Sequence, residues 1–266
     1  RDIFEENPFI QSHQRAIVIE VWDSGFTAID EKFNFETIQW DDSYSWAREF
    51  LDENRRGKAP KGFMDLLDVG DLVYLSEEND QVKLDQIPQA QSSLISFNPK
   101  TGEVLSYVGG SVFNDSQFDR VRQSYPQSGS VFKPFIYASA FSGGYNPSSL
   151  INDAPIIFED ENLETFWRPE NYSGKFYGLT TLREALVQSI NIVSIKLLRE
   201  IGIKKSSETI DNFGFGTERL PQDLSLALGS GNFSPAEVAR GFSVFANGGM
   251  ISDIHYVSQI KDKNGD

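Results

Sequence analysis

The 266-residue chain contains no cysteine, which excludes disulfide bonds and metal sites built on thiolates. It contains only two histidines, His13 and His255, and neither lies in a cluster with the spacing of metal ligands. A catalytic triad based on histidine and a histidine-rich metal site are therefore both disfavoured. If the chain carries a nucleophilic serine, a lysine is the more credible general base.

Basic residues are scarce relative to acidic ones. The chain has 24 lysines and arginines against 39 aspartates and glutamates, a formal charge of −15 at pH 7. Nucleic acids and anionic membranes repel such a chain, so neither is expected as a partner. No apolar run approaches the roughly 20 residues that cross a bilayer, and no signal peptide is recognisable at Arg1. The composition is that of a globular protein, and the abrupt ends predict a piece of a longer one.

The first part of the chain predicts a small all-β domain. After a linker at residues 1–14, the pattern favours a short helix from Asp41 or Asp42 to Leu51. Short strands are expected near residues 16–21, 26–29, 35–38, 69–75 and 82–84. Five short strands and one helix suit a small Greek-key barrel of the OB type, which we expect over residues 15–88.

Residues 89–266 predict an α+β domain. A β-hairpin is expected over residues 92–108, with Asn98-Pro99-Lys100-Thr101-Gly102 as its turn. Several helices follow, two of them marked by the capping patterns Thr181 to Glu184 and Ser234 to Glu237. Another strand is expected around Tyr256.

The strongest chemical signal is the pair Ser130 and Lys133, in the spacing S-x-x-K. Gly129 permits a tight backbone approach just before the serine, and the apolar residues that follow predict a buried helix. A serine hydroxyl needs a base to take its proton, and a lysine can serve if burial lowers its pKa. The start of a helix also offers N–H groups to an oxyanion. Four residues thus supply a nucleophile, a candidate base and part of an oxyanion site.

A second match to the S-x-x-K spacing is interpreted as chance. Ser258 and Lys261 repeat the S-x-x-K spacing, but in a stretch that alternates like a strand, where their side chains would point to opposite faces. Lys100-Thr101-Gly102 belongs to the expected hairpin turn and is interpreted as part of a plain turn.

Several stretches together resemble the catalytic region of class A penicillin-binding proteins. The resemblance covers roughly residues 90–266, and residues 15–88 resemble the OB-type insert of such proteins from Gram-negative bacteria. The stretches that carry it are Val108–Gly110, Phe118–Arg120, Gly129–Phe135, Trp167–Tyr172, Thr181–Asn191, Leu226–Gly231 and Asn247–Gly249.

The resemblance implies a penicillin-binding/β-lactamase-like transpeptidase fold with three motifs, S-x-x-K, S-x-N and K-T-G. It implies that Ser130 is the acylated nucleophile and Lys133 its proton acceptor. Ser189 and Asn191 would form the second motif, in which Ser189 relays the proton towards the leaving group. Asn191 would bind the substrate amide and help to hold Lys133, and Gly129 would also contact substrate.

Two further S-x-N matches, Ser96 to Asn98 and Ser230 to Asn232, are interpreted as structural. The family's K-T-G strand follows S-x-N in sequence, so Lys100-Thr101-Gly102 does not fit its place. We expect the real strand beyond Asp266, which leaves the transpeptidase domain incomplete, and we expect residues 1–266 alone not to complete turnover. No metal or organic cofactor is implied.

The implied activity is that of a peptidoglycan D,D-transpeptidase. It would cross-link stem peptides ending in D-Ala-D-Ala through a serine acyl-enzyme and would be inhibited by β-lactams. The implied parent protein is membrane-anchored on the periplasmic side of the inner membrane, has a glycosyltransferase domain absent here, and binds a lipoprotein activator at residues 15–88. The alternatives are a D,D-carboxypeptidase or β-lactamase-type hydrolase, with water as acceptor, and a sensor or scaffold that binds β-lactams without turnover.

Overall fold

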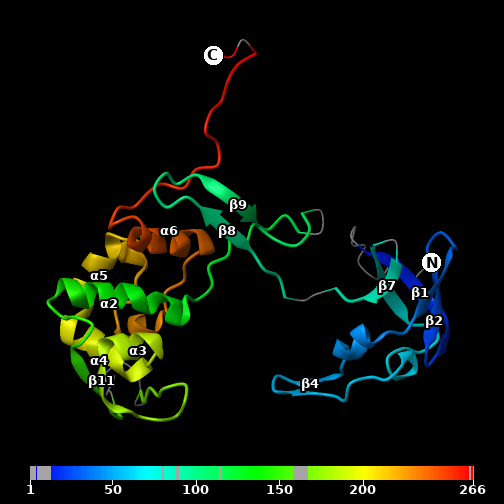
Figure 1. Ribbon diagram of the computed structural model, residues 1–266, viewed down its shortest axis with the longest axis horizontal. Helices are drawn as coiled ribbons and strands as arrows, with labels where there is room; N and C mark the ends of the chain where they lie inside the picture. Colours follow the sequence, from blue (N-terminus) through cyan, green and yellow to red (C-terminus); the bar gives the residue numbers. More distant parts are fainter. Residues whose placement is uncertain are drawn as a thin grey trace. The chain divides into compact units, whose positions relative to one another are not determined.

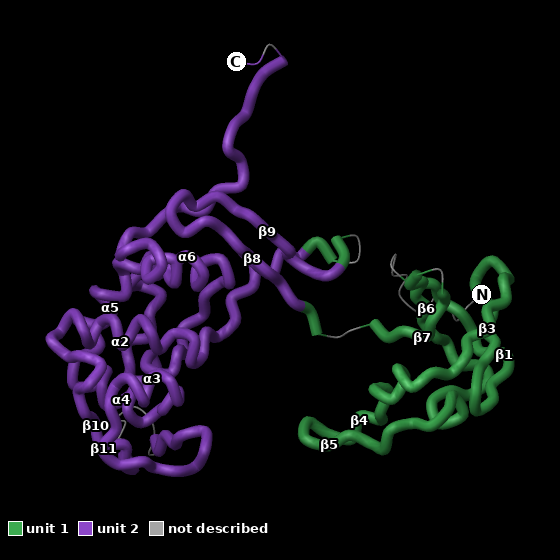
Figure 2. The backbone as a smooth tube through the Cα atoms, in the orientation of Figure 1, with its two compact units in different colours: residues 1–91, 112–117 green, residues 92–111, 118–266 purple. Residues whose placement is uncertain are grey.

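The structure, a computed structural model, describes Phe4 and residues 13–79, 81–87, 90–113, 116–157, 167–263 and 265. Most of the predicted linker at residues 1–14 lies outside the described residues. The chain divides into two compact units (Figure 2). Unit 1 comprises residues 1–91 and 112–117, and unit 2 comprises residues 92–111 and 118–266. Each unit has a hydrophobic core of its own.

Unit 1 is built on one antiparallel sheet of five strands (Figure 1). Alternate residues of the first strand, such as Ala16 and Val18, are buried in one core with Phe26 and Phe63, as the period of a strand requires. The two edge strands of the sheet contact each other, so the sheet curls. The prediction of a small β domain with these strands is confirmed. The strands, in their order across the sheet, are β3 (Phe35–Gln39), β2 (Gly25–Asp30), β1 (Gln14–Trp22), β6 (Leu72–Glu78) and β7 (Gln81–Asp85).

The helix predicted to end at Leu51 is shorter than expected. Asp41 caps it as predicted, accepting a 2.7 Å hydrogen bond from the Ser43 N–H, but the element is a 3-10 helix, η1 (Asp42–Trp46). Tyr44 is its one buried residue, so no continuous apolar face exists to extend it. The chain continues into a small hairpin and a second 3-10 turn: β4 (Phe50–Asp52), β5 (Arg55–Arg56) and η2 (Phe63–Asp65).

Unit 2 begins with the predicted hairpin, formed by β8 (Leu94–Phe97) and β9 (Val104–Val108). Lys100 lies in its turn, where its N–H donates to the Asn98 side chain. The strand predicted near Tyr256 is wrong in extent, because only His255 pairs, in an isolated bridge with Glu103. A strand needs a neighbour along its length, and the described residues supply one at that single position.

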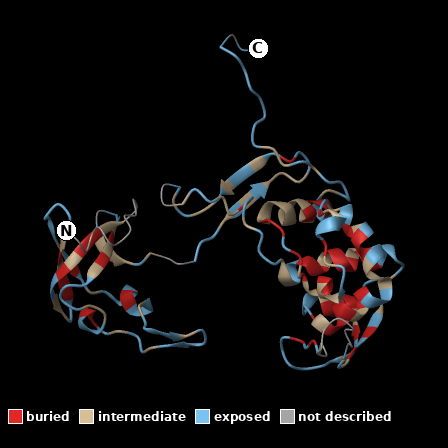
Figure 3. Ribbon diagram, turned by 180° about the vertical axis from the view of Figure 1, so that it is seen from behind, coloured by how far each residue is buried: buried red, intermediate tan, exposed pale blue. Residues whose placement is uncertain are grey.

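The helices of unit 2 surround a core rich in phenylalanine, and Figure 3 shows buried residues concentrated in them. Phe135 is fully buried, and its ring contacts the rings of Phe132 and Phe215. The α+β class is confirmed. The helical elements are η3 (Gly129–Phe132), α2 (Lys133–Ser142), α3 (Leu182–Val187), α4 (Asn191–Ile201), α5 (Ile203–Asp211), η4 (Thr217–Arg219), η5 (Leu224–Leu228) and α6 (Pro235–Ala246).

A second hairpin in unit 2 was not expected. It pairs β10 (Leu150–Asp153) with β11 (Gly178–Thr181), two four-residue strands that are far apart in sequence. The sequence pattern predicts no strand at these positions, because both strands are short, lack a longer run of β-branched residues and are not joined by a tight turn. The hairpin leads directly into α3 through the Thr181 cap, whose side chain accepts from the Glu184 N–H.

We predict that replacing Phe135 with alanine destabilises unit 2 by about 3–5 kcal/mol, because its core cannot close around the lost ring. Guanidinium unfolding followed by circular dichroism at 222 nm reports on α2 to α6, which all lie in this unit. Leu105→Ala on β9 is the control, because Leu105 is 64% exposed and its removal should change stability by only about 0.5 kcal/mol. Equal effects of the two substitutions would contradict the assignment of the core.

Candidate active site

Ser130 lies in the 3-10 turn η3, immediately before the α-helix rather than inside it. The helix α2 begins at Lys133, and the Lys133 N–H donates to the Ser130 carbonyl within the turn. Pro134 occupies the first turn of α2, as predicted. The serine is exposed, whereas Lys133 is only 1% exposed. The turn therefore presents the serine to solvent, while the lysine three residues on is buried.

Backbone contacts hold the turn that carries Ser130. Gly129 has a φ of +59° and donates its N–H to the Gly229 carbonyl at 2.9 Å. Ser128 donates both its N–H, at 3.0 Å, and its hydroxyl, at 3.1 Å, to the Gly231 carbonyl. The two segments approach so closely that a Cβ on Gly229 would lie 1.9 Å from the Gly129 oxygen. The S-x-N match at Ser230 thus lies in this packing contact.

Lys133 is brought together with both predicted residues of the second motif. Its Nζ donates to the Ser189 carbonyl at 2.7 Å, to the Ser189 hydroxyl at 3.1 Å and to Asn191 Oδ1 at 2.7 Å. Burial disfavours the charged form and lowers the pKa of Lys133 to about 8. The structure therefore supplies a lysine that is poised between ammonium and free amine near neutral pH.

Ser189 sits in the break between α3 and α4. Its backbone has a φ of +53°, a left-handed conformation that is uncommon for a residue other than glycine. The turn is held by hydrogen bonds from the Ser189 N–H to Leu186 and from the Ile190 N–H to Ala185. This backbone cost of about 1–2 kcal/mol places both the carbonyl and the hydroxyl of one residue on Lys133.

Asn191 is held by Glu170 and Asn171, which lie in no helix or strand. Its Nδ2 donates to the Glu170 carbonyl at 2.9 Å, and its backbone N–H donates to Asn171 Oδ1 at 3.0 Å. Asn171 in turn donates to the buried carboxylate of Asp153. Sequence reasoning included Asn171 in a family-like stretch but gave it no role, and it missed Asp153.

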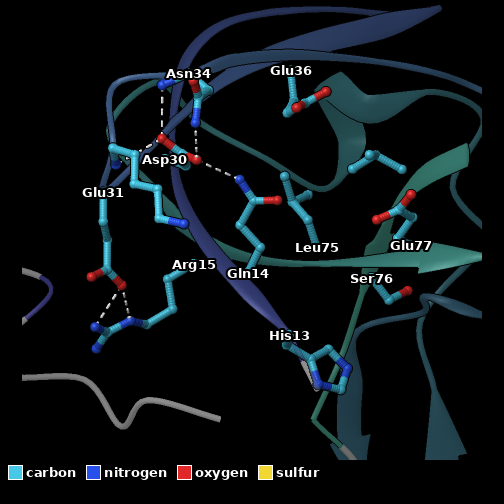
Figure 4. Close-up of a pocket in the computed structure, with 12 residues that line it drawn as sticks. His13, Gln14, Arg15, Asp30, Glu31, Asn34, Glu36, Leu75, Ser76 and Glu77 are labelled. Carbon is cyan, nitrogen blue, oxygen red and sulfur yellow. Dashed lines mark hydrogen bonds and ion pairs between the residues drawn. The ribbon is translucent and has the colours of Figure 1, made fainter. Parts of the chain in front are cut away.

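A separate pocket lies in unit 1 (Figure 4). The Asp30 carboxylate there accepts hydrogen bonds from Gln14 and Asn34, and Arg15 pairs with Glu31. The hydrogen bonds from the Asn34 side chain and the backbone lower the pKa of Asp30 against the effect of its burial. These bonds join β1, β2 and the turn after β2, which is a structural use of the charges.

Among the residues that the structure describes, no group of three or more histidine, cysteine or acidic side chains could hold a metal ion. None of the described helices is both long and apolar enough to cross a membrane.

Comparison with known families assigns both parts of the chain. The family described as the penicillin binding protein transpeptidase domain matches residues 93–266, and the one described as the penicillin-binding protein OB-like domain matches residues 1–90. The chain therefore belongs to the penicillin-binding proteins, and the predicted resemblance is confirmed.

Its relatives include proteins named penicillin-binding protein 1A. The chain is 42% identical to the one from Pseudomonas aeruginosa over 251 residues, which cover 94% of this chain and 30% of that protein. It is 37% identical to the one from Escherichia coli over 220 residues, which cover 83% of this chain and 26% of that protein. The crystal structure of penicillin-binding protein 1A from Haemophilus influenzae matches with a TM-score of 0.79 and 30% identity, over 99% of this chain and 37% of that one. The chain thus spans only about a quarter to just over a third of these relatives.

We predict that Gly229→Ala disturbs the turn that carries Ser130. Gly248 also has a positive φ, +62°, but a Cβ there would meet no atom within 4 Å, so Gly248→Ala is a matched control. The control should cost about 1–2 kcal/mol from the backbone conformation alone. Gly229→Ala should cost about 1–3 kcal/mol more, from its collision with Gly129. Urea unfolding measures both, and equal losses would contradict the close packing of the two segments.

Proposed function

We propose that this chain supplies the nucleophile and the general base of a peptidoglycan D,D-transpeptidase that β-lactams inhibit. The observation that carries the proposal is the buried Lys133, one helical turn after Ser130 and hydrogen-bonded to Ser189 and Asn191. The substrate is a stem peptide ending in D-Ala-D-Ala. Gly129, Ser189 and Asn191 contribute to the surface on which that peptide binds.

Acylation begins when the neutral amine of Lys133 accepts the proton of the Ser130 hydroxyl. The ammonium form of Lys133 donates its protons to oxygen atoms of Ser189 and Asn191 and has no lone pair. Only the neutral amine can therefore accept the serine proton. The Ser130 Oγ forms a bond to the carbonyl carbon of the penultimate D-alanine. The peptide C–N bond breaks, and the leaving D-alanine takes up a proton relayed from Lys133 through the Ser189 hydroxyl.

Deacylation reverses the roles of the same groups. An amine of a neighbouring stem peptide attacks the ester carbon, a new amide C–N bond forms, and the bond to Ser130 Oγ breaks. The proton lost by the amine returns through Ser189 and Lys133 to the Ser130 oxygen. Asn191 Oδ1 keeps the Lys133 amine in reach of both hydroxyls during each step. A β-lactam forms the same ester with Ser130 but is released slowly.

We further propose that residues 15–88 are the OB-type insert, that residues 89–266 are the N-terminal part of the transpeptidase domain, and that the K-T-G strand follows Asp266. The chain covers 30% of the Pseudomonas relative, which leaves room for that strand and for a glycosyltransferase domain and membrane anchor. This parent protein would act on the periplasmic side of the inner membrane. A lipoprotein activator at the OB-type insert stays a prediction from resemblance. Because we expect residues 1–266 alone not to complete turnover, the acylation tests use the full-length protein.

The competing functions share the acyl-enzyme and differ in its fate. A carboxypeptidase or a β-lactamase-type hydrolase gives the acyl group to water, and a sensor keeps it. The similarity of both domains to penicillin-binding protein 1A favours transfer to an amine. A product formed only when an amine acceptor is present separates the transpeptidase from each of the others.

We predict a single covalent adduct on Ser130 after incubation with a penicillin, detected by mass spectrometry of the intact protein. Ser130→Ala should abolish the adduct because it removes the hydroxyl that lies one turn before the buried Lys133. Ser258→Ala, which removes the serine of the second S-x-x-K match, is the control and should keep the full adduct. An adduct that survives Ser130→Ala in a folded protein would contradict the assignment of the nucleophile.

We also predict that the acylation rate rises with pH to a plateau, with its midpoint near the Lys133 pKa of about 8. The active form is the free amine, which exists above the pKa, so the rate should fall about tenfold for each pH unit below about 7. Stopped-flow measurement with a chromogenic β-lactam between about pH 6 and about pH 9.5 gives the profile. A rate that is flat or falls with pH across this range would rule out Lys133 as the base.

A further inference from the structure

We propose that Asn171 and Asp153 are positioning residues that fix the orientation of Asn191 and thereby the place of the Lys133 amine. The inference rests on the proposed function, since it concerns how the second motif is held against the first. Neither residue touches Lys133 or Ser130 through any hydrogen bond that the structure shows. Their effect on the reaction would pass entirely through Asn191.

The first observation is that α4 has no cap of its own. Its N-cap residue, Ile190, has no side chain able to accept a hydrogen bond from the first turn. Asn171 supplies the missing acceptor from a distant segment. Its Oδ1 accepts from the N–H of Asn191 at 3.0 Å and from the N–H of Ile192 at 3.1 Å. The helix therefore begins where Asn171 holds it, and Asn191 is its first residue.

The second observation is that Asp153 fixes which way round the Asn171 amide lies. The Nδ2 group donates to both carboxylate oxygens of Asp153 and to the Lys175 carbonyl, each at 2.9 Å. A flipped amide would direct its oxygen at the carboxylate and its NH₂ group at two backbone N–H groups. The carboxylate therefore makes Oδ1 the only atom that Asn171 can present to α4.

The same reasoning fixes Asn191. Its Nδ2 donates to the Glu170 carbonyl, the residue next to Asn171, which leaves Oδ1 for Lys133 Nζ. One short segment, Glu170 and Asn171, thus grips Asn191 by both its backbone and its side chain. A flip of the Asn191 amide would set its NH₂ group against the Lys133 ammonium, so the grip protects the contact with the general base.

The third observation is the burial of the charge. Asp153 is 1% exposed and Asn171 is 6% exposed. The hydrogen bonds that the structure shows for the Asp153 carboxylate come from Asn171 and the Tyr177 N–H, and the nearby Lys196 ammonium bonds instead to the carbonyls of Asn152 and Ala154. A buried carboxylate that is paired with an amide rather than a cation is costly for stability alone. A role in fixing the Asn171 amide accounts for the presence of such a costly group here.

The experiment exchanges the two side chains in the full-length protein. Asn171→Asp alone sets two buried carboxylates against each other and should slow acylation by a penicillin about 100-fold, the effect of a displacement of about 1 Å in an active site. In an Asp153→Asn background the same substitution restores the acceptor for α4 and the bond between the two side chains, because the introduced carboxylate can accept from both α4 and the new amide. Only the Lys175 carbonyl then loses its donor. There Asn171→Asp should speed acylation, to within about tenfold of the parent.

This change of sign is a result that loss of stability alone does not produce, provided the rates are measured on folded protein well below its melting temperature. Asn146→Asp, which adds the same charge on an exposed loop and keeps its turn acceptor, should acylate like the parent. If Asn171→Asp alone does not fold, the comparison of Asp153→Asn with the double variant still decides. The proposal is overturned if Asn171→Asp fails to speed acylation in that background, or if it folds and acylates at the parental rate alone.

A failure of the proposed function would look different. In that case the parent protein itself would form no adduct on Ser130, and no variant could change the rate. A parent that is acylated and an exchange without effect would leave the transpeptidase intact and remove only the role of Asn171 and Asp153.

Discussion

The site depends on one buried amine. Lys133 has almost no contact with solvent, and three oxygen atoms from Ser189 and Asn191 receive its protons. Burial lowers the pKa of Lys133, while the hydrogen bonds to these acceptors reduce the free-energy cost of its charged form. The chain has only two histidines. A lysine whose pKa is lowered in this way can take and return a proton near neutral pH in place of a histidine.

Several features of the backbone serve that amine. The Gly129 and Gly229 contact sets the turn that carries Ser130, and the left-handed Ser189 directs two oxygens of one residue at the same nitrogen. Both are local departures from regular structure, one at the start of the 3-10 turn η3 and the other at the break between α3 and α4. Strain of this kind persists where surrounding contacts determine it, and at Ser189 the hydrogen bonds of the Ser189 and Ile190 N–H groups supply them.

Much of this was predictable from the sequence. The spacing of Ser130 and Lys133 predicted that pair, because a short motif carries its own geometry at the start of a helix. Ser189 and Asn191 were predicted from the resemblance to a family, since they lie 56 and 58 positions after Lys133 and no local spacing links them to it. The strands of unit 1 were found because their alternation is local. Asp153 was not found, because its role depends on a hairpin between β10 and β11 that leaves no pattern in either strand. The strand around Tyr256 was overestimated for the opposite reason: its alternation is clear, but pairing depends on a neighbour that the sequence pattern does not reveal.

The hydrogen bonds of Lys133 also have a consequence for the order in which the chain folds during its synthesis. The carbonyl and hydroxyl of Ser189 lie 56 positions after the lysine in the chain. While the polypeptide is being made, α2 can therefore emerge complete but still lack every acceptor for its ammonium group. The apolar faces of α2 favour collapse, but collapse at that stage would bury the charged amine without a hydrogen-bond acceptor. The first turn of α2 should thus stay hydrated until the residues of the α3–α4 break arrive, which makes closure of this core and assembly of the hydrogen-bonded cluster around Lys133 a single late event.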